Sequence, residues 1–269
     1  MQVSLWNAMK TNLLQPNKYM PTIIQLLTPL AVVLGLGAEW YWWIVAVVFF
    51  LAYRMIGHGV GLHRYYCHKQ FTISRFSEWF IGWFSLMSCV GSPSSYTLVH
   101  LVHHKYTDTD LDPHGPANGI RSILYWFWNP PLDLEKTPIF TRRLTELMPY
   151  MWIHNFYWPL IAINAFVLYL ISWELFLFAW WIPMSFTIWE LVFSVYISHW
   201  HLGVHAPVNH NNYSGRLLPF HEYLHRTHHI YPNLGNQALN KHEFDYTYHL
   251  CRLFAREWRQ EKLDETIQA

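Results

Sequence analysis

Histidine is concentrated in three short groups of this sequence, with spacings typical of metal ligands. The groups read HRYYCH, HLVHH and HRTHH. In the second and third groups, positions i, i+3 and i+4 lie on one face of a helix, so three imidazoles point the same way. The two histidines of the first group lie five residues apart, and they converge only if the helix ends or distorts between them. The eight residues are His63, His68, His100, His103, His104, His225, His228 and His229.

A fourth segment, SHWHLGVH, follows the last apolar stretch and adds His199, His201 and His205. The eight grouped histidines and one of these make nine, more than one metal commonly holds, so we expect two metals. Neutral imidazole is the usual protein ligand of Zn, Cu and Fe, and it does not by itself select a redox metal. Burial of so many polar rings without partners would cost several kcal/mol, which argues against a purely structural role.

Long apolar segments surround these groups. Hydrophobic residues make up 52% of the chain and charged residues 13%, about half the share of a soluble domain. Lys and Arg are absent between Lys18 and Arg54 and again between Arg143 and Arg216. Each gap can hold two spanning helices of roughly 20 residues, joined at GLGAEW and near SWE. Two buried helical hairpins in a soluble protein are the alternative, but they would form an unusually large core.

We therefore predict an all-α integral membrane protein that forms a single domain, residues 1–269. Four transmembrane helices in two hairpins support a cytoplasmic helical cap that holds the di-metal histidine site. The spans are expected near 20–36, 40–60, 156–173 and 176–198, and the cap comprises 61–155 and 199–269. Because both hairpin turns lack Lys and Arg, the positive-inside rule places the N- and C-termini in the cytoplasm.

Smaller features complete these expectations. The three scattered cysteines, Cys67, Cys89 and Cys251, indicate reduced thiols. The formal net charge of +1 gives no indication of a nucleic-acid partner. The tail after Leu250 is expected to form an amphipathic helix.

At the histidine groups the sequence resembles the membrane fatty-acid desaturases of the Δ9-type acyl-lipid and acyl-CoA branch. The resemblance rests on GLHRYYCHKQF, HLVHHKYTDTDLDPHG and EYLHRTHHIYP, and it extends over about residues 20–250. It implies an oxidoreductase in which nine histidines hold two Fe ions. With O2 as co-substrate, the enzyme would introduce a cis double bond, at Δ9, into a saturated acyl chain.

The resemblance also implies a division of the ligands. One metal is expected to be held by His63, His68, His100, His104 and His229, and the other by His103, His201, His225 and His228. His201 is chosen because SHWHLG occupies the place of the family's ninth histidine. No catalytic residue is expected beyond the metal ligands, although Asp108, Asp110 and Asp112 could orient imidazoles.

Two positions depart from the family pattern. The family has Asn four residues before the ninth histidine, where this chain has Ile197, so His199 or His205 would have to compensate. His58 stands where relatives usually have an apolar residue.

The partners follow from the same resemblance. The substrate is a fatty acyl chain on a lipid or on CoA, embedded in or taken from the lipid bilayer. No fused electron-transfer motif is evident, so a separate donor such as ferredoxin or cytochrome b5 is expected. A related di-iron hydroxylase or a decarboxylase that forms terminal alkenes is the nearest alternative. A metal transporter is a third, but transporters place ligands at mid-membrane in interrupted helices.

Overall fold

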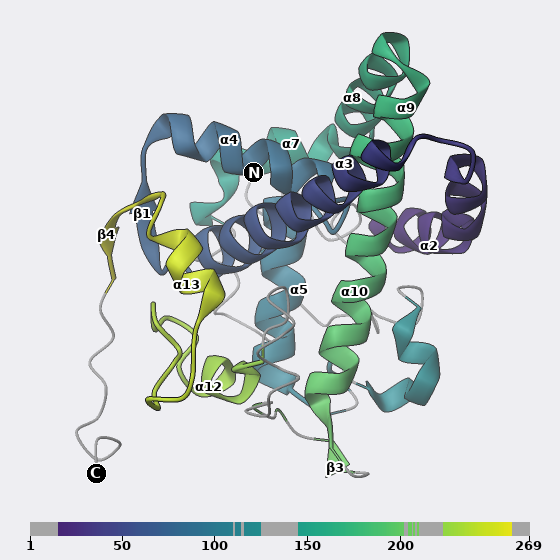
Figure 1. Cartoon of the computed structure of the whole chain (residues 1–269). Coiled ribbons are helices and arrows are strands. Elements are labelled where there is room, and N and C mark those ends of the chain that lie inside the picture. The colour runs from purple at the N-terminus through teal and green to yellow at the C-terminus, as the bar shows by residue number, and fades with distance from the viewer. Residues whose placement is uncertain are drawn as a thin grey trace, which may run out of the picture.

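The structure is a computed structural model in which helices predominate (Figure 1). It describes residues 16–109, 111–113, 116–124, 145–201, 204–205, 207, 209 and 223–259.

The first apolar gap forms two helices joined by a tight turn, as the sequence predicts. Helix α2 comprises Pro16–Gly35 and helix α3 comprises Trp40–Leu51. The chain then continues without a break into η1, Ala52–Cys67. Segment η1 is a π-helix, in which each backbone N–H bonds to the carbonyl five residues earlier. This ladder brings residues five apart onto one face, which is the distortion that the spacing of His63 and His68 requires.

The second apolar gap also forms a helical hairpin. It comprises α8 (Tyr157–Ile171), α9 (Trp173–Phe176), the short π-helix η6 (Leu177–Trp181) and α10 (Ile182–His199). Ser172 makes the turn, since its hydroxyl caps the next helix by accepting a 3.0 Å hydrogen bond from the Leu175 N–H. In Figure 1, α10 descends from α9 at the top toward β3 at the bottom.

Two of the helices are long and apolar enough to cross a membrane, namely Trp40–Cys67 and Trp173–His199. Met148–Asn155 and Tyr157–Ile171 add a third if this pair, bent by 59°, counts as one span. The apolar part of α2, Tyr19–Gly35, is shorter. The described helices thus provide two or three of the four predicted crossings.

The middle of the chain packs against these helices. It comprises β1 (Phe71–Ile73), α4 (Arg75–Met87), α5 (Pro93–Tyr106), η2 (Pro116–Ile123), η5 (Met148–Tyr150) and α7 (Met151–Asn155). Ser74 and Ser92 are the N-caps of α4 and α5, and each accepts a backbone N–H three residues later. Gly91 lies in the break between α4 and α5, and Pro93 is the first residue of α5.

Two glycines allow η1 and α4 to approach closely. A Cβ at Gly57 would lie 2.5 Å from the backbone oxygen of Phe84, and one at Gly61 would overlap the Ser85 hydroxyl. That hydroxyl donates a 2.7 Å hydrogen bond to the Gly57 carbonyl. Larger residues here would push α4 away from the part of η1 that carries His63.

The C-terminal part of the chain returns to the first histidine group. Helix α12 comprises His225–Ile230 and helix α13 comprises Tyr246–Cys251. The expectation of an amphipathic helix after Leu250 is wrong for residues 251–259, and residues 260–269 lie outside the described residues. Helix α13 ends at Cys251. Ala255–Trp258 then forms strand β4, which pairs antiparallel with β1. Pairing with β1 buries Phe71 against Trp258, a long-range contact that helical periodicity in the tail cannot reveal.

A second small ribbon follows α10, where β2 (Trp200–His201) pairs antiparallel with β3 (Val204–His205). The three cysteines are buried and form no disulfide, as expected for reduced thiols.

Candidate metal centre

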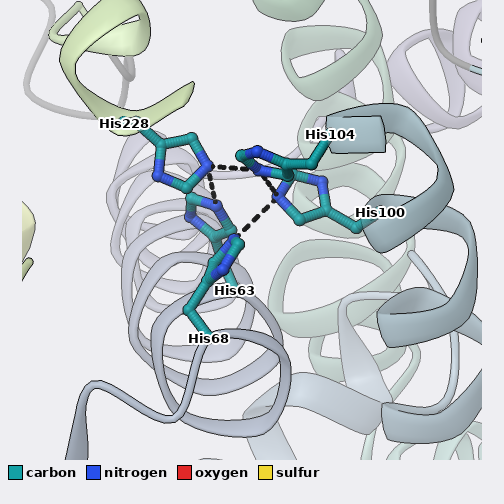
Figure 2. A group of neighbouring side chains, drawn as sticks. All are labelled: His63, His68, His100, His104 and His228. Atoms are coloured by element: carbon teal, nitrogen blue, oxygen red, sulfur yellow. Dashed lines mark hydrogen bonds between the residues drawn. The ribbon is translucent and has the colours of Figure 1, made fainter. Parts of the chain in front are cut away.

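Five histidines from three helices form a first group (Figure 2). His63 and His68 come from the end of η1, and His100 and His104 from α5. His228 from α12 completes the group. Their candidate ligand atoms all lie within 4.8 Å of one another. The Nε2 atoms form a chain of contacts of 2.8–3.1 Å: His63 to His228, His228 to His104, His104 to His100, and His100 to His68.

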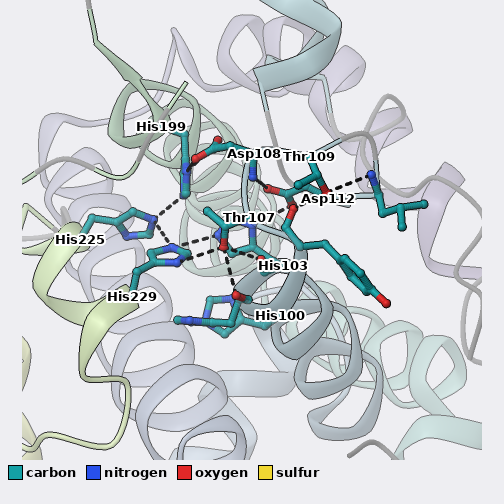
Figure 3. A network of polar contacts seen from close by, with 12 residues as sticks. His100, His103, Thr107, Asp108, Thr109, Asp112, His199, His225 and His229 are labelled. Carbon is teal, nitrogen blue, oxygen red and sulfur yellow. Dashed lines mark hydrogen bonds and ion pairs between the residues drawn. The ribbon is translucent and has the colours of Figure 1, made fainter. Parts of the chain in front are cut away.

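Four histidines form a second group of the same kind (Figure 3). His103 comes from α5, His199 from the last residue of α10, and His225 and His229 from α12. Their Nε2 contacts are 3.1 Å for His103 to His229, 3.1 Å for His229 to His225 and 2.7 Å for His225 to His199.

The two groups adjoin. The rings of His104 and His229 stack with centroids 4.4 Å apart, although they belong to different groups. Helices α5 and α12 each contribute to both groups. On α5, positions i and i+4 lie in the first group and i+3 in the second, and on α12 this is reversed. The structure therefore brings all eight predicted histidines of the three motifs together.

The grouping differs from the expected one at two residues. His229 was expected with the first group and His228 with the second, and the structure places them the other way. The reason is geometric: adjacent residues of a helix point about 100° apart, so His228 and His229 face different groups, and His225 points closer to the direction of His229 than to that of His228. His225 and His229 therefore remain together, with ring centroids 4.6 Å apart.

Among the described residues, His199 is the fourth histidine of the second group. Helix α10 continues through this residue, which is fully buried and faces His225. His201 lies two residues beyond the helix end, in β2, and its side chain is outside the described residues. With His199 in this place, the residue four positions earlier is Val195, so the amide of the family pattern is again absent. The match of SHWHLG to the family motif predicts His201, whereas the position of His199 at the end of α10 places its ring beside His225.

The segment after α5 orients three of the four rings of the second group (Figure 3). The carboxylate of Asp112 lies 2.8 Å from Nδ1 of His103, and both oxygens of Asp108 lie 3.2 Å from Nδ1 of His199. The Thr107 hydroxyl lies 3.2 Å from Nδ1 of His229. A carboxylate that accepts Nδ1–H leaves the Nε2 lone pair directed inward, which is the form that binds a metal. The predicted orienting contacts of Asp108 and Asp112 are therefore present, and Asp110 lies outside the described residues.

Asp108 makes its contact from an unusual backbone conformation. Its φ of 60° lies in the left-handed region, which aspartate tolerates better than most residues. The turn lets the Asp108 N–H donate a 2.8 Å hydrogen bond to Asp112. The Asp112 carboxylate is thus held by the backbone of Asp108 as well as by His103.

A buried ion pair supports the first group from the other side. Arg64 of η1 donates from Nη2 to both oxygens of Asp245, at 3.0 and 2.9 Å, and to Oε1 of Gln237 at 2.9 Å. Gln237 in turn lies 2.9 Å from Nδ1 of His228, and its backbone N–H donates to Asp245. Both charged side chains are only 4% exposed. This network fixes the segment before α13 to η1 and, through Gln237, the His228 ring.

The electrostatics of the site favour neutral imidazoles. Burial lowers the pKa of His100 and of His228 well below its usual value, and the adjacent imidazoles lower it further. Neutral rings supply lone pairs, so nine converging imidazoles fit two borderline divalent cations. The Nδ1 atoms of His103 and His199 face carboxylates, so the Nε2 atoms of these two rings are the most clearly oriented to bind a metal.

The pKa shifts predict that the metal-free protein loses stability in acid. An unfolded histidine has a pKa of about 6.5. Since the pKa values of His100 and His228 are lowered in the folded protein, the unfolded chain binds more protons below that pH. The free energy of unfolding should then fall as pH drops through about 6.5, by up to about 1.4 kcal/mol per pH unit for each group.

Thermal unfolding of the metal-free protein in detergent, at about pH 7.5 and about pH 5.5, measures this effect. The double variant His100→Gln, His228→Gln should show a weaker dependence. Equal unfolding midpoints for the unaltered chain at both pH values would contradict the prediction.

Comparisons with known proteins agree with this geometry. The family model described as "Fatty acid desaturase" matches residues 40–245. The sn-1 stearoyl-lipid 9-desaturase of Anabaena variabilis is 25% identical over 231 residues, which cover 79% of this chain and 80% of that protein. The Delta-9 acyl-lipid desaturase 1 of Arabidopsis thaliana is 26% identical over 227 residues, 78% of this chain and 72% of that protein.

A shorter match is to a protein named for a different reaction. The hex-5-enoyl-(acyl-carrier protein) acetylenase of Moorena producens is 36% identical over 83 residues, 29% of this chain and 26% of that protein. The family model spans most of the chain and includes both histidine groups. The chain therefore belongs to the fatty acid desaturase family.

Proposed function

We propose that this protein is an O2-dependent fatty acyl desaturase that introduces a cis double bond, at Δ9, into a saturated chain at a di-iron centre. The observation that carries the proposal is the pair of adjoining imidazole groups. His63, His68, His100, His104 and His228 would hold one iron, and His103, His199, His225 and His229 the other. His201, the ninth ligand expected from the sequence, remains the alternative to His199.

The chemistry explains why the site is built from metal ligands alone. Hydrogens on mid-chain CH2 groups are not acidic, so acid–base residues cannot remove them. An iron pair held by the two histidine groups would supply the oxidising chemistry that their removal needs. Removal of two hydrogens with reduction of O2 to two waters consumes two electrons and two protons. The electrons would come from a separate donor of the ferredoxin or cytochrome b5 type.

The protein's own residues hold the ligands and limit their motion. Asp108 and Asp112 accept the Nδ1 hydrogens of His199 and His103, which keeps each Nε2 directed inward. Gln237 contacts Nδ1 of His228. These contacts reduce the reorganisation that metal binding would otherwise require.

We place the centre in a cap beneath four spans, with both termini in the cytoplasm. Helices α2, α3–η1, α8 and α9–α10 would form the crossings in two hairpins. The absence of Lys and Arg from both hairpin turns supports this orientation.

An apolar pocket provides a place for the acyl chain. It has a volume of about 590 Å³ and lies between α4, α7 and the start of α8. Leu86, Ile153 and Leu160 are among its lining residues. Trp79 and Trp152 also line it, and both side chains are exposed. Its remaining lining residues include Tyr66, which shares a buried cluster with Tyr96, and Tyr96 stacks on His100. We propose that an acyl chain from the bilayer enters through this pocket.

Filling the pocket should weaken the binding of long chains. Gly82 lines it, and a Cβ there would lie 3.2 Å from the Tyr66 hydroxyl. We expect Gly82→Leu to raise the apparent KM for a long saturated substrate roughly 10-fold, about 1.4 kcal/mol of apolar contact, with a smaller effect on short chains. The measurement is product formation against chain length by gas chromatography.

The matched control is Gly37→Leu, because this turn glycine has no atom within 4 Å of an added Cβ. An unchanged chain-length profile in Gly82→Leu would exclude this route for the substrate.

The proposed reaction is tested by expression in a desaturase-deficient host. Fatty acids are profiled, and double bonds are located by mass spectrometry of derivatised esters. New mid-chain monoenes should form with the unaltered chain and with His154→Ala, and disappear with His103→Ala. His154 is buried against Ser92, outside both groups, and therefore serves as the control.

A related activity is the second candidate, because one relative is an acetylenase. Hydroxylated acids, alkenes or alkynes in place of monoenes would identify a hydroxylase, a decarboxylase or an acetylenase. If only saturated fatty acids are found with iron-loaded protein supplied with ferredoxin and its reductase, the proposed function is overturned.

A further inference from the structure

A chain of four polar side chains runs from the core of the helical hairpins to the first histidine group. Arg54 of η1 forms an ion pair with Glu190 of α10, and the two side chains are 3% and 14% exposed. Arg54 Nη1 lies 2.7 Å from Nδ1 of His58, one helical turn later on η1. Nε2 of His58 lies 2.9 Å from the hydroxyl of Tyr96 on α5. His58 is 2% exposed and Tyr96 is 9% exposed.

The last two members of this chain stack on two candidate ligands. The His58 ring lies parallel to His63, with centroids 5.9 Å apart and planes 11° apart. The Tyr96 ring lies parallel to His100, with centroids 5.3 Å apart and planes 16° apart. The first stack follows from the π-helix, because residues five apart on η1 lie on the same face.

Hydrogen-bond chemistry fixes the orientation of the chain. A guanidinium only donates, so Nδ1 of His58 must accept from Arg54. Neutral His58 then carries its hydrogen on Nε2 and donates it to the Tyr96 oxygen. The guanidinium does not release a proton, so the chain is not a proton pathway from Glu190. These hydrogen bonds instead fix the orientation of the His58 and Tyr96 rings.

The ion pair between Arg54 and Glu190 holds one end of this chain in place. Arg54 and Glu190 lie within the two helices that are long and apolar enough to cross a membrane. An ion pair in such helices is costly and is retained where it serves a function. Glu190 provides the countercharge that allows Arg54 to hold His58 from inside the helical core.

We propose that Glu190, Arg54, His58 and Tyr96 form a positioning chain for the first metal. The chain sets the ring planes of His63 and His100, and through them the affinity and ligand field of the five-histidine group. The second group takes its orientation from Asp108, Asp112 and Thr107 instead. The inference rests on the proposed function in one respect, namely that these histidines hold metal.

The test is a Co²⁺ titration of purified metal-free protein in detergent, followed by visible absorption. It is made with the otherwise unaltered chain and in the His199→Ala background, in which the second group lacks one histidine. We expect His58→Leu to weaken Co²⁺ binding at the first group roughly 10–100-fold and to shift its absorption bands, without change at the second. Tyr96→Phe keeps the ring and removes the hydroxyl, so a smaller change of the same kind is expected.

Rescue and control variants separate positioning from general destabilisation. His58→Gln can accept from Arg54 and donate to Tyr96, so it should recover a substantial part of the affinity. His154→Leu removes another buried histidine and should leave both Co²⁺ sites unchanged. Thermal unfolding midpoints establish that each variant is folded.

Unaltered affinity and bands at the first group in folded His58→Leu or Tyr96→Phe would overturn the positioning chain. Equal weakening of both groups would also overturn it. Failure of the unaltered chain to bind Co²⁺ would instead overturn the proposed metal centre, so the two failures are distinguishable.

Discussion

Replacing His199 by alanine should abolish desaturation, whereas replacing His201 should not. His199 ends α10 fully buried, and its Nε2 lies 2.7 Å from that of His225. Its Nδ1 faces both oxygens of Asp108, which is the arrangement of an oriented ligand. Loss of an orienting partner commonly costs about 10–100-fold in metal affinity or activity, so loss of the ligand itself should cost about 100-fold or more.

Metal content provides the second measurement. Iron per chain, measured by mass spectrometry of purified protein, should fall by about half in His199→Ala if each group holds one ion. His201→Ala is the matched control, two residues away in β2, and should retain the metal content of the unaltered chain. The opposite pattern, with loss in His201→Ala alone, would restore His201 as the ninth ligand.

Breaking the ion pair between Arg64 and Asp245 should strongly destabilise the protein. Both side chains are 4% exposed, so Asp245→Leu leaves a buried guanidinium without its carboxylate. Such a loss commonly costs roughly 3–5 kcal/mol. For a chain of this size, the thermal unfolding midpoint should fall on the order of 10 °C. The measurement is thermal unfolding in detergent of protein with metal removed, so that metal loss does not contribute.

A double variant separates stability from metal binding. Arg64→Met combined with Asp245→Leu removes both charges and should recover much of the stability. It should still bind metal more weakly at the first group, because Gln237 loses the partner that holds it against His228. Glu146→Gln, in the half-exposed pair with Lys69, is the control and should cost less than about 1 kcal/mol. A similarly small cost for Asp245→Leu would contradict the prediction.

The sequence predicts the helices of this fold better than it predicts their pairing. The turns at GLGAEW and at Ser172 lie where the gaps in Lys and Arg place them, since apolar length and helix breakers are local properties. The strand Ala255–Trp258 was missed because it depends on Phe71, far away in the chain. Its segment, AREW, has no alternation strong enough to exclude a helix.

The candidate site shows the same division. Type and spacing select the eight histidines of the motifs, because helical periodicity brings i, i+3 and i+4 onto one face. Whether His228 or His229 joins the first group depends on the angle at which α12 meets α5. The helical periodicity of α12 alone does not determine that angle. The choice of His199 depends on where α10 ends. The role of Gln237 depends on a turn before α13, and no motif marks it.

The order of the ligands along the chain has a consequence for biosynthesis. The first group combines His63 with His228, and the second combines His103 with His229. Neither group is complete until α12 has left the ribosome, by which time all the predicted crossings have been synthesised. If the two groups hold metal as proposed, neither site can be completed before the segments proposed to cross the membrane have been synthesised, and a nascent chain that stalls before α12 has an incomplete set of imidazoles.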